Sequence, residues 1–136
     1  MGSHFGAARG RHDRELAMEK INLLEKLSLF EEKWTPKIVG ALNGQEVKLA
    51  KIEGDFVWHA HAEEDELFLV LEGSLVMKFR DREVQLGVGE MIIVPRGVEH
   101  MPVAAEGASV LLFEPAGTAH TGGVVSERTV NDQKWI

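Results

Sequence analysis

The sequence contains no cysteine among its 136 residues. This absence excludes disulfide bonds, thiolate metal ligands and cysteine nucleophiles, and it is compatible with a reducing cytoplasm. No apolar run approaches the ~20 residues that are needed to span a bilayer, and the N-terminus lacks the apolar segment of a secretory signal. We therefore expect a cytoplasmic protein that does not insert into membranes.

Positive charge is also scarce, because 15 Lys and Arg residues stand against 22 Asp and Glu residues and leave a net charge of −7. The basic residues are scattered along the chain. Nucleic acids and anionic membrane surfaces repel such a protein, so we expect neither as a partner. The length and the 44% of hydrophobic residues are typical of one globular domain with one core.

The first 17 residues differ from the rest of the chain. Residues 1–4 read Met-Gly-Ser-His and resemble the remnant of an expression tag, and residues 6–12 have no periodicity. We expect residues 1–17 to be a tag or a disordered leader, and residues 18–136 to form the domain.

One or two short helices are predicted in residues 23–33. Asn22 is a suitable N-cap, and Glu25 follows it at the spacing of a capping box. Pro36 ends the region. The apolar stripe of this segment would consist of Leu24, Leu27 and Phe30.

Everything after Pro36 is typical of β-strands. Asn43 and Gly44 separate two alternating runs and predict a tight hairpin turn, because both residues tolerate positive φ. Many short strands with regular turn signals predict an all-β sandwich or barrel. The predicted strands are residues 37–42, 46–52, 56–60, 66–72, 74–79, 83–86, 91–94, 99–104 and 109–114, with one more possible at Val124 and Val125.

Four residues predict a metal site: His59, His61, Glu66 and His100. On a strand, His59 and His61 would project from the same face. Glu66 begins the next strand after a short acidic loop, so the chain's return would bring it beside the two histidines. His100 follows a turn at residues 95–97 that would re-aim the chain toward them.

The ligand types indicate which metals fit. Neutral imidazoles with one carboxylate suit Fe²⁺, Mn²⁺, Ni²⁺, Cu²⁺ or Zn²⁺ better than Ca²⁺ or Mg²⁺. Four protein ligands on an octahedral ion leave two positions for water, dioxygen or substrate. A His-x-His pair alone more often consists of surface or core histidines. The full pattern is far more specific, because it also fixes Gly73, Gly89, Pro95 and Gly97 at set offsets.

Residues 59–73 and 89–100 resemble the two signature motifs of the cupins. The resemblance implies a small jelly-roll β-barrel preceded by the short helices, in which His59, His61, Glu66 and His100 hold one divalent transition metal (Fe, Mn, Ni, Zn or Cu). More loosely, residues 21–136 are similar to small single-domain cupins of the mannose-6-phosphate-isomerase-like kind. The sequence departs from the motifs at non-ligand positions, with a spacing one residue shorter before His59 and with Ala104 in place of asparagine.

Residues 66–71 are apolar on both faces of the predicted strand, apart from Glu66. A strand that is apolar on both faces is buried on both. One face would line the barrel, and Leu67, Leu69 and Leu71 would need a cover on the other. The N-terminal segment or a second subunit could supply it. We favour a homodimer, a common arrangement among small cupins.

Other residues have two interpretations each. His120 is either an acid/base group at the barrel mouth or, as we favour, a surface-loop histidine. Residues 63–65 are more simply a solvated acidic loop than a cation-attracting patch. Trp58 lies in the core or an interface. Ordinary core packing explains the candidate pocket walls, Phe56, Phe68, Met77, Phe79 and Met101, as well as a pocket does. The arginines that could contact an anionic substrate, and that are usually solvated at turns, are Arg80, Arg82 and Arg96.

The sequence leaves the reaction open. A metal-dependent enzyme of the dioxygenase, isomerase or lyase type, acting on a small organic molecule, is slightly favoured. A non-catalytic module that senses or carries a small ligand is the main alternative, and a structural cupin is the third. No acid or base residue is assigned, and no cluster of basic residues points to a phosphate.

Overall fold

The computed structural model describes residues 18–120, 122 and 133–136. The expected leader, residues 1–17, and the possible strand at Val124 and Val125 lie outside the described residues. None of the helices described is both long enough and apolar enough to cross a bilayer.

The helical segment is shorter than predicted. Helix α2 spans Leu23–Leu27, and its N-cap Asn22 accepts a hydrogen bond through Oδ1 from the backbone N of Glu25 at 3.1 Å. The predicted stripe is wrong at Leu24, whose side chain is 63% exposed, whereas Leu27 and Phe30 are buried. The helix ends after five residues, so Leu24 and Phe30 do not share a helical face.

The remaining elements are strands. The described strands are β1 (Lys37–Leu42), β2 (Gln45–Asp55), β3 (Glu66–Gly73), β4 (Leu75–Phe79), β5 (Glu83–Leu86), β6 (Met91–Val94), β7 (His100–Pro115) and β8 (Lys134–Trp135). Strands were predicted for β1 to β7, whereas β8 lies where the sequence predicted no strand. The turn between β1 and β2 has φ angles of 51° at Asn43 and 78° at Gly44. The predicted hairpin is therefore confirmed, with positive φ at both central residues.

Some strand predictions are wrong: β2 extends to Asp55 and not to residue 52, and two further differences are larger. Residues 56–60 form no strand, and only His59 makes an isolated bridge there, to His100. The predicted strands 99–104 and 109–114 are one strand, β7, because β2 pairs with it on both sides of the presumed break. Residues 105–107 of β7 lie opposite Glu53 alone, so the segment read as a turn is a bulge.

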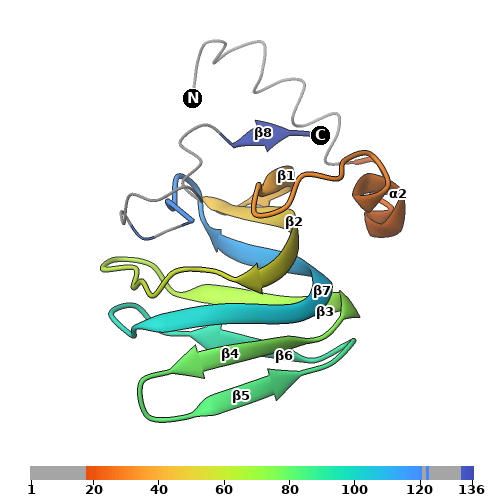
Figure 1. The fold of residues 1–136 in the computed structure, drawn as a ribbon. Helices are drawn as coiled ribbons and strands as arrows, with labels where there is room; N and C mark the ends of the chain where they lie inside the picture. Colours follow the sequence, from red (N-terminus) through yellow and green to blue (C-terminus); the bar gives the residue numbers. More distant parts are fainter. Residues whose placement is uncertain (1–17, 121, 123–132) are drawn as a thin grey trace.

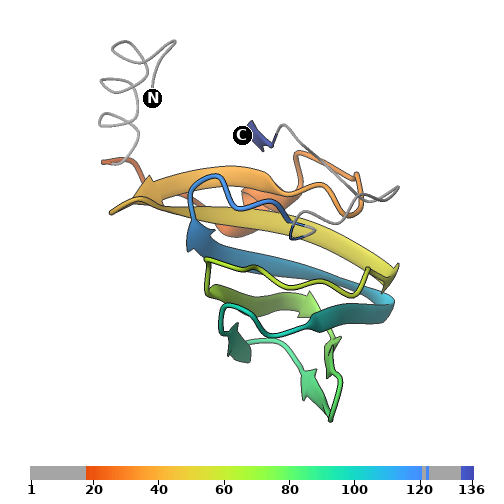
Figure 2. The same ribbon diagram turned by 90° about the vertical axis from the view of Figure 1, so that its left-hand side faces the viewer.

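Strand β7 pairs with three other strands of the eight-stranded sheet (Figures 1 and 2). Residues 103–115 of β7 pair with β2, with the bulge at residues 105–107 between the two paired parts. On its other edge, the first part pairs with β4 and the second part pairs with β3. Strands β5 and β6 extend β4 and β3, while β1 and β8 extend β2. The change of partner at the bulge curves the strands into the predicted jelly-roll barrel.

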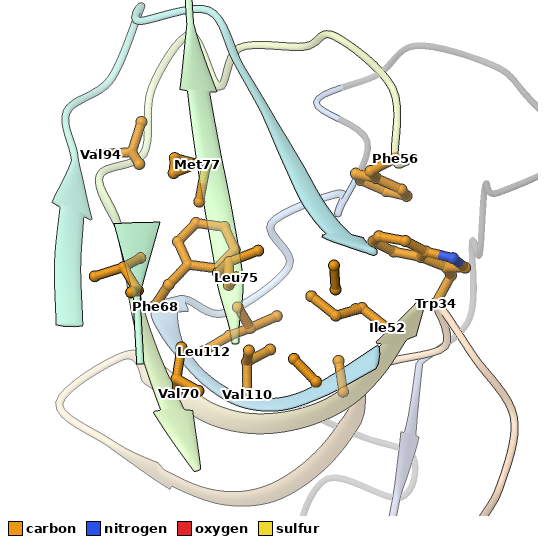
Figure 3. Packing of buried hydrophobic residues seen from close by; sticks show 14 of the residues in the cluster. Trp34, Ile52, Phe56, Phe68, Val70, Leu75, Met77, Val94, Val110 and Leu112 are labelled. Carbon is orange, nitrogen blue, oxygen red and sulfur yellow. The ribbon is translucent and has the colours of Figure 1, made fainter. Parts of the chain in front are cut away.

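The barrel encloses the main core. Figure 3 shows Phe68, Val70, Val110 and Leu112 pointing inward, with the rings of Trp34 and Phe56 lying parallel at one end. The centroids of these two rings are 4.6 Å apart. A second apolar cluster packs on the outside of the barrel and includes Leu27, Phe30, Val39 and Leu49, with Leu23, Val47, Leu71, Leu111 and Ile136 beside them. The N-terminal segment and the C-terminal residue therefore cover part of the outer face.

Candidate metal centre

The four predicted metal ligands come together inside the barrel. Glu66 begins β3 and His100 begins β7, whereas His59 and His61 belong to the irregular segment before β3. All four side chains are buried. One potential ligand atom from each side chain lies within 4.8 Å of those of the other three. The cluster is compatible with a single metal ion.

Backbone contacts place the two histidines of the irregular segment. His59 and His100 exchange two hydrogen bonds, with N to O distances of 3.0 and 2.9 Å. The backbone N of Gly97 donates to the carbonyl O of His61 at 2.8 Å. These bonds hold the segment against the residues that lead into β7. The sequence-based interpretation that His59 and His61 lie on one regular strand is therefore wrong.

Two of the imidazoles have a fixed tautomer. The Nδ1 of His59 lies 2.9 Å from the carbonyl O of Val57, and the Nδ1 of His100 lies 2.9 Å from the carbonyl O of Val98. A carbonyl oxygen only accepts hydrogen bonds, so each Nδ1 donates and each Nε2 keeps its lone pair. Orientation of a ligating imidazole through its other nitrogen is typical of metal sites.

The polar atoms at the centre of the cluster are not satisfied by the described residues. The Nε2 atoms of His61 and His100 lie 3.2 and 3.6 Å from Oε1 of Glu66. None of these three buried atoms has a hydrogen-bond partner of suitable geometry within the described part of the chain. Buried polar atoms are rarely left unpaired, because their desolvation is costly. A cation among them would satisfy all three.

Burial and neighbouring charges set the protonation of the cluster. Burial, and after it the proximity of His100, lowers the pKa of His59 from 6.5 to about 4. Burial opposes ionisation of Glu66, but contacts with Glu114, His100 and His61 outweigh it and lower the pKa of that carboxyl group. A neutral imidazole and an ionised carboxylate are the forms that bind metals.

A second buried carboxyl group lies beside the cluster. The Nζ of Lys48 donates to Oε2 of Glu114 at 2.6 Å, and both side chains are 0% exposed. Burial raises the pKa of Glu114, and the negative charge of Glu66 raises it further, although Lys48 opposes the shift. The sequence-based interpretation missed both residues. The available signal was that Glu114 alternates with Val110 and Leu112 along an otherwise apolar run.

An apolar cavity of about 30 Å³ adjoins the cluster. His59 and Glu66 belong to its lining, and so does His120, which is buried and does not lie on the surface as we had favoured. The other lining residues are Trp34, Pro36, Ala50, Ile52, Phe56, Phe68, Pro102, Val110 and Leu112. Of the predicted wall residues, Phe56 and Phe68 line the cavity. Met77, Phe79 and Met101 belong to the surrounding core.

The arginines and the acidic loop lie away from this cavity. Arg80 stacks on Trp58, with the guanidinium carbon 3.8 Å from the ring centroid, and donates to Glu99. Arg96 pairs with Asp65, and Arg82 lies 3.7 Å from Asp81. Residues 63 and 65 are exposed and residue 64 is half-buried, as expected for a solvated loop.

Comparisons with known proteins agree with this architecture. The family described as "Cupin domain" matches residues 45–114. A crystal structure of a cupin-2 domain protein from Shewanella frigidimarina is 46% identical, with a TM-score of 0.69, and the match covers 70% of this chain and 93% of that one. The uncharacterised protein YdbB of Bacillus subtilis is 36% identical over 80 residues, which are 58% of this chain and 71% of YdbB.

A more distant likeness shows the fold alone. The solved structure of a hydroquinone 1,2-dioxygenase in complex with Cd²⁺ and 4-hydroxybenzonitrile is 18% identical, with a TM-score of 0.59. The match covers 71% of this chain and 72% of the dioxygenase chain. The same fold is therefore used by a dioxygenase.

Proposed function

Because this chain belongs to the cupin domain family, we propose that it is a metal-dependent enzyme that acts on a small organic molecule. The observation that carries the proposal is the convergence of His59, His61, Glu66 and His100, whose ligand atoms lie within 4.8 Å of one another inside the barrel. We propose all four side chains as ligands of one ion.

The donor set fits a divalent transition metal. Three imidazoles and one carboxylate favour iron, manganese, nickel, zinc or copper over calcium and magnesium. The unpaired Nε2 atoms of His61 and His100 and the unpaired Oε1 of Glu66 support this fit. When bound, such an ion supplies Lewis-acid catalysis, or dioxygen activation if it is redox-active.

The cavity beside the cluster indicates the kind of substrate. Its lining is almost entirely apolar, and none of the described residues that form it is Lys or Arg. A phosphorylated sugar would bury its charge there with no Lys or Arg to pair with it, which is costly. We therefore propose an uncharged or weakly charged small molecule, and the mannose-6-phosphate-isomerase-like resemblance supports the fold but not that substrate. Oxygenation, isomerisation and lyase chemistry are the candidate reactions.

The chain's own residues have definite roles in this proposal. The carbonyl groups of Val57 and Val98 hold the imidazoles of His59 and His100 in one orientation. Phe56 and Phe68 exclude water from the side of the cluster that faces the cavity. Excluding water strengthens every electrostatic interaction there.

A second candidate function is non-catalytic binding of a small ligand. The cavity volume of about 30 Å³ favours it, because such a space holds only one or two water molecules. A larger molecule enters only if the lining side chains move. Turnover separates the two functions, since a sensor or carrier binds its ligand without changing it.

We also propose that the protein is a cytoplasmic homodimer whose single domain comprises residues 18–136. Support for the dimer comes from the outer face of the barrel. Leu67 pairs with Ile93 on one side and with Phe113 on the other, and Leu69 pairs with Met91, so their side chains form one apolar face. The side chains of Met91 and Ile93 are each 55% exposed. A second subunit would cover this face.

Metal analysis tests the ligand set. The purified protein, stripped with a chelator and reloaded with Mn²⁺, Ni²⁺, Zn²⁺ or Co²⁺, should bind one ion per chain. Glu66→Gln and His61→Ala should each lower the affinity at least tenfold, as loss of a ligand does, whereas His120→Gln should not. A stoichiometry that survives replacement of all four proposed ligands would falsify the assignment.

Activity assays test the enzyme against the sensor. Oxygen uptake is measured for each metal-loaded form with a panel of neutral diketones, phenols and hydroxy acids, and substrate loss is followed by mass spectrometry. Consumption of a panel member that depends on Glu66 supports an enzyme. Saturable binding of a panel member without conversion, with every metal, supports the sensor.

A further inference from the structure

The barrel interior contains an unusual row of charged side chains beside the proposed metal centre. Lys48 on β2 and Glu114 on β7 are both 0% exposed, and their charged groups are 2.6 Å apart. Lysine and glutamate are almost never fully buried unless they are paired. The Nζ of Lys48 also lies 3.7 Å from Oε1 of Glu46, whose side chain is 14% exposed.

The strand register explains how these groups meet. Leu67 pairs with Phe113, so the next position along each strand sets Glu66 opposite Glu114. On the other edge of β7, Glu46 pairs directly with Glu114. The carboxyl group of Glu114 therefore lies between two others on neighbouring strands. Like charges in opposed positions destabilise a sheet, and Lys48 is the cation that contacts this row.

We propose that Lys48 and Glu114 are positioning residues of the metal centre. Lys48 anchors Glu114, and Glu114 fixes the place and orientation of the Glu66 carboxylate from the adjacent strand. The inference rests on the proposed function, because it assumes that Glu66 is a metal ligand. Partners of ligating carboxylates typically change metal affinity by about 10–100-fold.

A purely structural role makes a different prediction. Replacing a buried ion pair by apolar residues of similar volume is often neutral or stabilising. The double variant Lys48→Met/Glu114→Leu should therefore remain folded, yet it should bind metal more weakly. Lys37→Met/Glu32→Leu is the control, because Lys37 is also buried and pairs at 3.2 Å with Glu32, whose side chain is 58% exposed, away from the cluster.

The experiment titrates Co²⁺ into the metal-free proteins and records the visible absorption bands, which report the arrangement of ligands around the ion. We expect the Lys48→Met/Glu114→Leu variant to bind Co²⁺ about 10–100-fold more weakly than the wild-type protein, with shifted bands. The Lys37→Met/Glu32→Leu control should match the wild type in both affinity and bands.

A single substitution provides a second test if the double variant does not fold. Lys48→Arg keeps the buried positive charge and should retain Co²⁺ affinity within a few-fold, whereas Lys48→Met should not. The inference is overturned if Lys48→Met/Glu114→Leu has unchanged Co²⁺ affinity and bands. It is also overturned if Lys48→Arg and Lys48→Met have equal effects. Neither result contradicts the proposed metal site. Failure of the wild-type protein to bind any ion overturns the proposed function and the inference together.

Discussion

Asp65 binds Arg96 through three hydrogen bonds that join the two motif segments. Its Oδ1 accepts from the backbone N of Arg96 at 2.8 Å and from Nε at 3.2 Å, and its Oδ2 accepts from a terminal guanidinium nitrogen at 3.2 Å. Asp65 directly precedes Glu66, and Arg96 lies in the turn that leads to His100. The exposed pair therefore ties together the chain segments that supply two of the proposed ligands.

Loss of this contact should affect metal binding more than folding. In Asp65→Asn, one oxygen remains to accept from the backbone, but the paired contact with the guanidinium group is lost. We expect metal affinity to fall by less than about tenfold and the melting temperature to change by at most a few degrees, because the pair is exposed. Calorimetric titration and thermal unfolding measure both. Glu63→Gln, in the same loop, is the control. An equal loss of metal affinity in that variant would show that the negative charge of the loop, and not the contact between Asp65 and Arg96, causes the effect.

The parts of the fold that depend on local chemistry were predictable. Asn43 and Gly44 specified the hairpin because few other residue pairs tolerate two positive φ angles in succession. Strands β5 and β6 were predicted with their observed bounds because glycines and a proline flank them. Glu106 and Gly107 were read as a break between two strands, since a glycine interrupts the apolar pattern there. Their role as a bulge depends on pairing with β2, which is more than 50 positions away in the sequence.

The site was predictable in composition but not in all its parts. The spacing of His59, His61, Glu66 and His100 identified the cluster. Lys48 was not identifiable, because its strand carries lysines on both alternating faces, at positions 48 and 51. Only the partner at position 114 determines which lysine is buried. Such a pairing is a property of the sheet register and not of either segment alone.

Metal should stabilise the folded protein. A ligand that binds only the native state, at 100 times its Kd, contributes about 2.7 kcal/mol, which corresponds to roughly 10 °C in melting temperature for a domain of this size. We therefore expect chelator-treated protein to melt at a lower temperature, and added Zn²⁺ or Mn²⁺ to restore it. Glu66→Gln should show a much smaller response to the same ion. A shift of equal size in that variant would show that the ion acts elsewhere.

The stability of the metal-free protein should decrease as pH falls. His59 has a pKa of about 4 in the folded chain, below the ordinary histidine value of 6.5 that applies when the chain is unfolded. The unfolded chain therefore binds the proton first, so the contribution of His59 to stability is full above pH 6.5 and declines as pH falls toward 4. The loss is on the order of 3 kcal/mol. Urea unfolding at several pH values, in the presence of chelator, measures it, and His59→Asn should flatten this part of the profile.

Gly73 and Gly89 offer a matched pair of substitutions. Both residues have positive φ, 78° at Gly73 and 83° at Gly89. A Cβ at position 73 would overlap the carbonyl O of Gly107 in the bulge of β7, whereas a Cβ at position 89 would meet no atom within 4 Å. Gly89→Ala should cost only the backbone strain of about 1–2 kcal/mol. Gly73→Ala should cost several kcal/mol in urea unfolding, because backbone must shift. Equal losses would mean that the bulge adapts freely.

The outer face of β3 and β6 should determine the oligomeric state. Ile93 lies beside Leu67 on this face, and its side chain is 55% exposed, so a lysine there would be buried unpaired in a dimer interface. We expect Ile93→Lys to convert the dimer to a monomer in light scattering while the metal stoichiometry is unchanged. Val88→Lys is the control, because Val88 is 65% exposed in the turn between β5 and β6, away from this face. If Ile93→Lys remains a dimer and Val88→Lys does not, the interface lies at the turn. If the wild-type protein is already a monomer, the apolar face is covered from within the chain or remains in contact with solvent.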